Sequence, residues 1–251
     1  MEFRVGDGSV AVTVPDEATL LAALTERLRN GRGFTVATLN LDHLAKLHRD
    51  GAFRAAYAQA DLVTADGNPI VWLSRLAGRP VALLPGSDLI RPVLALCARE
   101  GAPVGLLGSS SAALERAAER LAAAIPDLVV CDRLAPPMGF DPAGPEAAAA
   151  LDRMAQAGAR VVLIALGAPK QERLAALGRG RHPGMGFLCI GAGLDFIAGH
   201  QRRAPLWMRR LALEWLWRLA GDPRRLAGRY ARAAAALPRH ARDALRMRRS
   251  S

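Results

Sequence analysis

The sequence predicts an α/β fold: a mostly parallel, Rossmann-like sheet with helices on both faces, followed by a C-terminal helical appendage. Short apolar runs rich in Val, Leu and Ile alternate along the chain with longer amphipathic stretches. Such alternation is typical of a parallel sheet that helices cover on both faces. A change of character near Gly199 separates an α/β core, residues 1–199, from a basic, amphipathic appendage, residues 200–251.

The expected elements follow one another in regular order. Residues 3–14 alternate weakly around Gly6-Asp7-Gly8, as in a hairpin. Strands are expected at residues 34–38, from Leu62 to just before Asp66, and at 103–107, 129–131, 161–166 and 187–190. Helices are expected from Pro15 to about Arg29, after Asn40, after Pro69 through Leu76, from Pro85, after Gly108-Ser109-Ser110-Ser111 and from Gly167.

Length and composition narrow the class of protein. The 251 residues suit one large domain, or one domain with an appendage, and a hydrophobic fraction of 51% supplies a sizeable core. Cys97, Cys131 and Cys189 lie far apart, without metal-ligand or disulfide spacing, which favours a reducing compartment. The N-terminus shows no signal-peptide pattern, and no apolar run approaches the roughly 18 residues of a spanning helix. We therefore expect a cytoplasmic protein.

The positive charge gathers at the C-terminal end of the chain. Residues 202–249 contain 14 Arg and three acids, which accounts for the whole net charge of +11. A basic tail on a neutral body indicates an anionic partner, such as phosphate groups, nucleic acid or an anionic membrane.

Asp66 stands at the end of a short apolar run, directly before Gly67-Asn68-Pro69. In open α/β sheets, ligands bind outside the carboxyl ends of the strands. A carboxylate at such a position can act as a general base toward a substrate hydroxyl. The alternative is an aspartate that caps the next helix or orders the turn.

Two other strands end in glycine-rich loops. Gly108 and Gly167 each follow an apolar strand and precede a helix, so both loops can hold an anion on a helix N-terminus. Gly191-Ala192-Gly193 has the first two glycines of a dinucleotide fingerprint but lacks the third, so NAD binding is not favoured.

The appendage has two predicted helices. Residues 206–219 are apolar nearly all round, with three of the four tryptophans of the chain and a polar stripe at Arg210, Glu214 and Arg218. Gly221-Asp222-Pro223 ends this helix, and a second one runs from Arg224 to about Leu237. Trp, Leu and Arg together suit a membrane interface, and the alternative is a helix that packs on its own domain.

The chain resembles the WecG/TagA/CpsF family of bacterial glycosyltransferases. The resemblance covers nearly the whole chain in the order of the family. It rests on Thr38-Leu39-Asn40, Ala60-Asp61-Leu62-Val63, Asp66-Gly67, Gly167 to Glu172, Gly191 to Gly199, Arg203-Ala204-Pro205, Trp207-Met208, Leu213 to Leu216, Arg218-Leu219 and Pro223-Arg224-Arg225.

The resemblance implies an inverting transfer of a hexose-type sugar from a UDP-sugar to an undecaprenyl-diphosphate-linked acceptor. It places the enzyme peripherally on the inner face of the cytoplasmic membrane, in cell-surface or exopolysaccharide assembly. It assigns the base role to Asp66 and brings the appendage arginines over the site. The substrate-binding residues expected are Thr38, Asn40, Gly67, Asn68, Gly108, Gly167, Lys170, Gln171, Asp195, Arg218, Arg224, Arg225 and Arg229. By residue type alone, Gln171 is either a solvated helix residue or a site residue.

The chain contains no Asp-x-Asp pair, which is the usual metal bridge to a nucleotide-sugar diphosphate. We therefore expect no cofactor and no metal, with arginines neutralising the leaving UDP. The expected partners are the UDP-sugar, the lipid-linked saccharide and an anionic membrane, not nucleic acid, and a homo-oligomer stays open. Two alternatives remain: a basic nucleic-acid-binding protein, and a non-catalytic scaffold of a polysaccharide assembly complex. The sequence does not reveal which sugar is donated.

Overall fold

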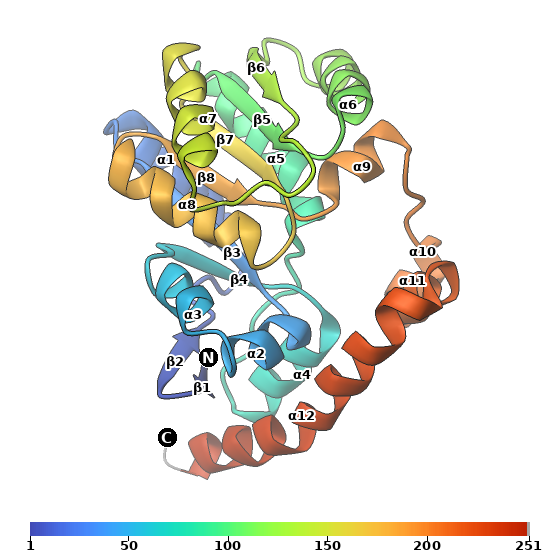
Figure 1. Cartoon of the computed structure of the whole chain (residues 1–251). Helices are drawn as coiled ribbons and strands as arrows, with labels where there is room; N and C mark the ends of the chain where they lie inside the picture. The colour runs from blue at the N-terminus through green and yellow to red at the C-terminus, as the bar shows by residue number, and fades with distance from the viewer. Residues whose placement is uncertain (250–251) are drawn as a thin grey trace.

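A computed structural model describes residues 1–249, except for the side chain of Arg225. Its centre is a six-stranded parallel sheet in the order β4-β3-β8-β7-β5-β6 (Figure 1). The strands are β3 (Phe34–Leu39), β4 (Leu62–Ala65), β5 (Val104–Gly108), β6 (Val130–Leu134), β7 (Val161–Ala165) and β8 (Gly186–Cys189). The predicted parallel α/β class is confirmed.

Helices cover both faces of this sheet because alternate residues of each strand point to opposite sides. Val36, Leu106 and Leu163 belong to the apolar cluster under one set of helices, whereas Leu107 and Ile164 belong to a cluster on the other side. The first set is α1 (Glu17–Arg29), α5 (Gly86–Arg99), α6 (Ser111–Ala124) and α9 (Gly193–Ala198). The second set is α7 (Pro145–Gln156) and α8 (Lys170–Arg181).

A third apolar cluster joins the two ends of the chain. It unites the antiparallel hairpin β1 (Glu2–Val5) and β2 (Gly8–Ala11) with α2 (Leu41–Leu47), α3 (Gly51–Ala58), α4 (Asn68–Leu76) and one residue of the last helix, Ala244. The predicted hairpin at residues 3–14 is therefore confirmed. It packs beneath the β3–β4 side of the sheet instead of extending it.

The appendage departs from its prediction at the first helix. In place of one helix over residues 206–219, the structure has α10 (Leu206–Arg210) and α11 (Glu214–Gly221). Ala212 lies between them with φ of 61°, a left-handed conformation that interrupts a right-handed helix. The periodicity of apolar residues continues across this position, so the break was not visible in the pattern.

The second appendage helix is longer than predicted. It was expected to end near Leu237, but α12 runs from Pro223 to Arg249 and passes through Pro238. Proline normally disfavours a helix interior. Here His240 and Ala244, which follow Pro238, are buried, and Leu237, Ala241 and Met247 pack on the third cluster. Tertiary packing therefore holds the helix together beyond the proline.

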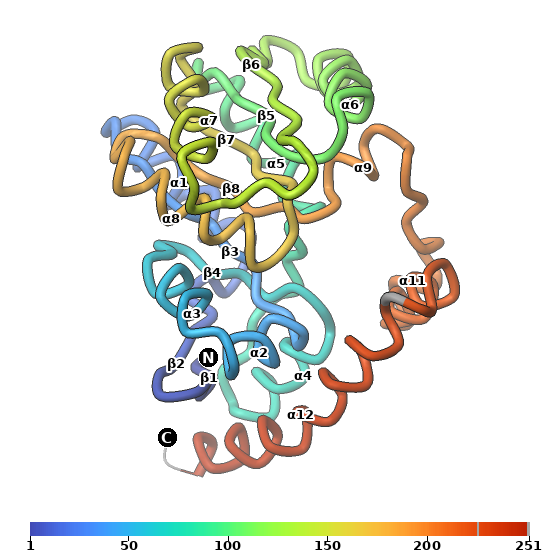
Figure 2. The backbone as a smooth tube through the Cα atoms, viewed as in Figure 1, coloured from blue at the N-terminus to red at the C-terminus, as the bar shows by residue number. Residues whose placement is uncertain are grey.

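The path of the chain places the appendage along one side of the core. After α9 the chain leaves the sheet, forms α10 and α11, and returns in α12 past α4 toward the N-terminal hairpin (Figure 2). Contacts of α12 with α2 and α4 dock this helix. Among the helices in residues 1–249, none is long and apolar enough to cross a membrane.

Candidate active site

Asp66 and Asn40 emerge side by side at the carboxyl ends of neighbouring strands. The register of the parallel pair β3–β4 places Leu39 opposite Ala65, and the Asp66 amide donates to the Leu39 carbonyl at 2.8 Å. The Asn40 Nδ2 then donates to the Asp66 Oδ2 at 3.3 Å. Gly67 follows with φ of 106°, a conformation that favours glycine and turns the chain into α4. Asp66 thus lies where this sheet type binds ligands.

The amide of Asn40 is fixed from both ends. Its Oδ1 caps α2 by accepting from the His43 amide at 2.9 Å, so its Nδ2 remains as the donor toward Asp66. Because one side chain both caps a helix and holds the carboxylate, the orientation of Asp66 depends on the start of α2.

Burial raises the pKa of the Asp66 carboxyl, because its charged form is poorly solvated there. The hydrogen bond from Asn40 and the positive charge of Arg218 oppose this shift by lowering the pKa of Asp66. The negative charges of Glu214 and Asp88 raise it further. The resulting upward shift makes the Asp66 carboxylate a stronger base than a solvent-exposed aspartate, which suits a general base.

Thr38 supports this site from inside the sheet. Its side chain is buried, and its carbonyl accepts hydrogen bonds from the Tyr57 hydroxyl and from the His43 Nδ1 at 2.8 Å. A Cβ on Gly86, the first residue of α5, would lie only 3.3 Å from the Thr38 Cγ2. Thr38 therefore packs against the start of α5 and fixes the end of β3.

The loop after β5 carries a second polar pair. Ser109, with φ of 55°, donates its hydroxyl to the Asp195 Oδ1, and the other carboxylate oxygen accepts from the Gln201 Nε2 at 3.2 Å. Gly108 is required for packing, since a Cβ there would lie 2.4 Å from the Ala165 carbonyl oxygen of β7. Gly108 therefore has a steric role. Asp195 lies beside the loop that begins at Gly108.

The segment from Gly167 to Glu172 binds neighbouring loops through its side chains. Lys170 is exposed and donates to the Phe140 carbonyl at 2.7 Å. Gln171 is buried, so its interpretation as a solvated helix residue was wrong: its Nε2 donates to Glu172 at 2.9 Å and its Oε1 accepts from the Gly191 amide at 2.9 Å. Gln171 therefore joins the carboxyl ends of β7 and β8.

Glu172 was not singled out from the sequence. Burial raises its carboxyl pKa to about 7, although the hydrogen bond from Gln171 acts to lower it. Its Oε2 is buried without a hydrogen-bond partner in the described residues, so the charged form of this carboxyl is poorly solvated. The preceding Pro-Lys-Gln signalled a helix start, but no local pattern indicated burial of this acid.

The appendage arginines occupy different places. Arg218 on α11 is exposed, and it is the arginine whose charge acts on the Asp66 pKa. Arg224 is exposed in the first turn of α12, and the side chain of Arg225 lies outside the described residues. Arg229 forms a bidentate pair with Asp42 on α2, with its Nη2 2.8 Å from the Asp42 Oδ2. Arg229 is thus bound to the core through Asp42.

An ionic cluster at the start of α5 was missed from the sequence. The Asp88 carboxylate accepts from Arg203, and it also accepts from the Arg209 Nη2 at 3.1 Å. These ion pairs attach the first part of the appendage to the core. Arg203 also lies over the ring of Phe196, 5.6 Å from its centroid. Asp88 sits in the Pro85-Gly86-Ser87-Asp88 helix start, but the sequence alone gave no partner for it.

The described residues contain no group of three or more His, Cys, Asp or Glu side chains arranged to hold a metal ion. The groups that act on the Asp66 carboxyl are the amide of Asn40, the guanidinium of Arg218 and the carboxyls of Glu214 and Asp88. Such a set can take a proton from a hydroxyl and attract a phosphate-bearing ligand.

A parallel α/β sheet with a partly buried carboxylate at the carboxyl end of one strand is an architecture in which ligands bind at that end of the sheet. The model of the Glycosyl transferase WecG/TagA/CpsF family matches residues 7–250. The chain therefore belongs to this family of glycosyltransferases, as its resemblance predicted.

Proposed function

We propose that the protein is an inverting glycosyltransferase that moves a hexose-type sugar from a UDP-sugar to an undecaprenyl-diphosphate-linked acceptor. The polymer would be a cell-surface polysaccharide or exopolysaccharide. Membership of the family supports the transferase class. The observation that carries the proposal is Asp66, held by Asn40, with its pKa raised by burial and with Arg218 acting on its charge.

In the proposed reaction, Asp66 accepts the proton of an acceptor hydroxyl as that oxygen attacks C1 of the donor sugar. The new C–O bond forms on the face opposite the departing UDP, whose oxygen keeps the electron pair of the broken bond. One displacement of this kind inverts the anomeric configuration. Arg218 faces the charge that develops on UDP, and Arg225 is proposed as its partner; such stabilisation is strongest where water is excluded.

No divalent metal takes part in this proposal. The absence of an Asp-x-Asp pair and the surplus of arginine in residues 202–249 support that choice. Guanidinium groups are permanently charged and bind phosphate oxygens in pairs, so they can replace a metal at a leaving diphosphate.

The membrane is the proposed location of the reaction. An apolar patch on α10, α11 and the turn between them consists of Leu206, Trp207, Leu211, Trp215 and Leu216, all exposed. Exposed apolar surface of this extent marks an interaction site, and Trp with flanking Arg suits lipid headgroups. We propose that this patch docks the enzyme on the inner face of the cytoplasmic membrane, where the lipid acceptor lies.

The test is release of UDP from a panel of UDP-sugars offered with a short polyprenyl-diphosphate-linked sugar. One donor should support release that depends on the acceptor, and the product should have the opposite anomeric configuration. Retention of configuration, or salt-sensitive binding of nucleic acid without any transfer, would overturn the proposal.

A further inference from the structure

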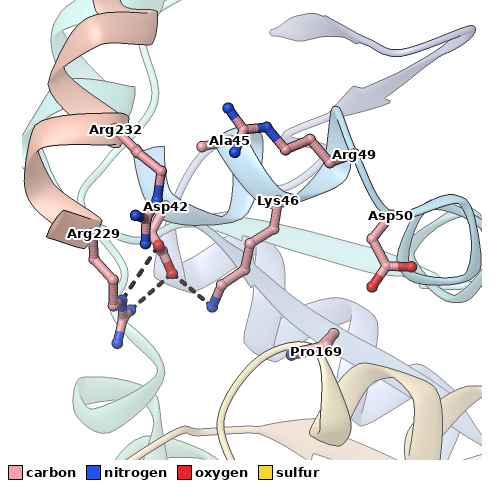
Figure 3. A pocket seen from close by; sticks show the side chains of 8 residues that line it. All are labelled: Asp42, Ala45, Lys46, Arg49, Asp50, Pro169, Arg229 and Arg232. Atoms are coloured by element: carbon pink, nitrogen blue, oxygen red, sulfur yellow. Dashed lines mark hydrogen bonds and ion pairs between the residues drawn. The ribbon is translucent and has the colours of Figure 1, made fainter. Parts of the chain in front are cut away.

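A pocket distinct from the Asp66 carboxylate lies between α2 and α12. Its volume is about 270 Å³, and we call it the α2–α12 pocket. Figure 3 shows Arg229 and Arg232 reaching from α12 toward Asp42 of α2, with the loop at Pro169 on another side. Its charged lining residues are Asp42, Lys46, Arg49, Asp50, Arg229 and Arg232.

Asp42 organises two of the four cations. Its Oδ2 pairs with the Lys46 Nζ at 2.8 Å and with the Arg229 Nη2 at 2.8 Å. Lys46 also donates to the Ala168 carbonyl at 3.1 Å, in the loop that precedes α8. Burial acts to raise the pKa of Asp42, but the hydrogen bonds from Lys46 and Arg229 outweigh it and lower the pKa. Lys46 and Arg229 are therefore held in place by an ionised carboxylate.

The other two cations are not engaged. Within residues 1–249, no hydrogen bond or ion pair occupies the guanidinium of Arg49 or of Arg232. Within the described residues, Asp50 is paired with neither of them, and its Oδ1 caps α3 by accepting from the Phe53 amide at 2.9 Å. The pocket therefore keeps an excess of positive charge with free donors, which is the chemistry that binds a phosphate or diphosphate.

The position of the pocket relative to Asp66 selects the ligand. Asn40, which holds Asp66, is also the N-cap of α2, and Lys46 follows six residues later. At about 1.5 Å per helical residue this is roughly 9 Å. That separation suits a ligand whose reacting hydroxyl lies at Asp66 and whose phosphate group lies about one sugar residue away.

One of the two glycine-rich loops expected to hold an anion lies elsewhere, whereas the other, which begins at Gly167, reaches Pro169 in the lining of the pocket. Gly108 and Ser109 follow β5, whereas α2 follows β3, and two strands, β8 and β7, separate β3 from β5 in the sheet. A phosphate in the α2–α12 pocket is therefore far from the Ser109–Asp195 pair and on the side of α12, which returns from the exposed apolar patch.

We infer that the α2–α12 pocket binds the diphosphate of the lipid-linked acceptor. The inference rests on the proposed function, since it names the substrate whose hydroxyl Asp66 would deprotonate. Lys46 and Arg229 form the fixed wall, and Arg49 and Arg232 close on the diphosphate oxygens. The UDP diphosphate is left to Arg218.

The experiment measures binding of farnesyl diphosphate, a short isoprenyl diphosphate, to the full-length protein by calorimetry. Arg49→Gln/Arg232→Gln should weaken this binding on the order of 10-fold or more, because two charge-assisted contacts are lost. The control Arg116→Gln/Arg242→Gln removes the same charge from exposed positions of α6 and α12 and should leave the affinity unchanged. UDP binding should be equal in all three proteins.

Each contrary result is specific. No binding of farnesyl diphosphate to the wild type, or equal binding to both double variants, would overturn the inference. Weaker UDP binding in Arg49→Gln/Arg232→Gln would assign the pocket to the nucleotide. If Arg49→Gln/Arg232→Gln lost binding to phosphatidylglycerol vesicles but kept binding to farnesyl diphosphate, the α2–α12 pocket would be assigned to membrane headgroups. Failure of every UDP-sugar to react would refute the proposed function, whereas this binding measurement would still give its own answer.

Discussion

The core and the appendage hold their apolar residues in opposite ways. In the core, alternate strand residues and helix faces meet in three buried clusters, and large residues such as Phe34, Phe53 and Phe187 are fully enclosed. In the appendage, Trp207 is 59% exposed and Leu211 is 64% exposed, although Met208, Leu226, Ala233 and Ala244 are buried. Most large apolar residues of the core are enclosed, whereas α10 and α11 expose most of theirs.

Ion pairs make up much of the attachment of the appendage. Asp88 holds Arg203 and Arg209, and Asp42 holds Arg229. Partly exposed ion pairs contribute little stability and are screened by salt. The core therefore holds Asp66 through its own strands and Asn40, while we expect the docking of the appendage to be the more sensitive of the two to salt.

The largest expected effect separates the two regions completely. A chain that ends at Gly199 should keep a cooperative thermal transition but lose transfer to background and lose vesicle binding, because Arg218, the apolar patch and the α12 wall of the pocket are removed. Circular dichroism, UDP release and vesicle sedimentation measure these three properties. Transfer at the full-length rate would show that the appendage has no catalytic part.

The next effect lies in the core alone. Asp66→Asn keeps the size of the side chain and removes its basicity, so turnover should fall by roughly 10² to 10⁴. UDP-sugar binding and the melting temperature should hardly change, because the partly buried carboxylate becomes a neutral amide. The conservative Thr64→Ser, two residues earlier in the chain and within β4, serves as a packing control. Near-wild-type turnover in Asp66→Asn would remove the base assignment.

Loss of the apolar patch should affect the appendage without the core. Trp207→Ser/Leu211→Ser changes two exposed side chains, so folding should be kept while binding to anionic vesicles falls on the order of 10-fold. Turnover with a water-soluble acceptor should be unchanged, and turnover with a membrane-embedded acceptor should fall. Trp72→Ser, a change at an exposed tryptophan of the core, is the matched control.

A smaller effect concerns pH and the docking of α12. Burial lowers the pKa of His240 below 6.5; the charges of His48 and Arg239 lower it further, and Asp243 opposes the shift. Burial also lowers the pKa of His48, together with the charges of Arg239, Arg54 and Arg49. Both rings face each other, 6.0 Å apart, and His240 also meets Phe3. Since the docked state favours neutral rings, docking should lose stability as pH falls through about 6.5.

Hydrogen-exchange protection of α12 measures this effect locally. The free energy of global unfolding would also contain a contribution from Glu172. The pKa of Glu172 is raised to about 7, so its contribution to stability is lost as pH rises. His240→Leu should reduce the loss of α12 protection between about pH 7.5 and 5.5. An unchanged loss in that variant would refer the pH response to other groups.

Removal of divalent metal ions is expected to have no effect on transfer. If arginines alone neutralise the leaving UDP, transfer in excess EDTA should equal transfer with added Mg²⁺ or Mn²⁺. A loss in EDTA that one metal restores would show that the metal-free proposal is wrong, and would leave the Asp66 assignment to be judged on its own variant.

Much of the core could be predicted because its signals are local. The strand that ends at Asp66, the glycine loops and the hairpin each occupy a few consecutive residues, and all were found near their observed positions. The appendage was predicted less well. Its apolar pattern runs through Ala212, where the helix breaks, and the end expected near Leu237 is overridden by packing of α12 against the core.

The sequence by itself determined the α/β class, the family, the position of Asp66 at a strand end and the gathering of charge in the appendage. Only the tertiary structure decided which side chains meet. Asn40 and Asp66 are 26 residues apart and pair because two parallel strands share one register. Asp42 and Arg229 are 187 residues apart and pair because α12 returns across α2. Periodicity and turn chemistry report on neighbours in sequence, so no local pattern could specify these partners.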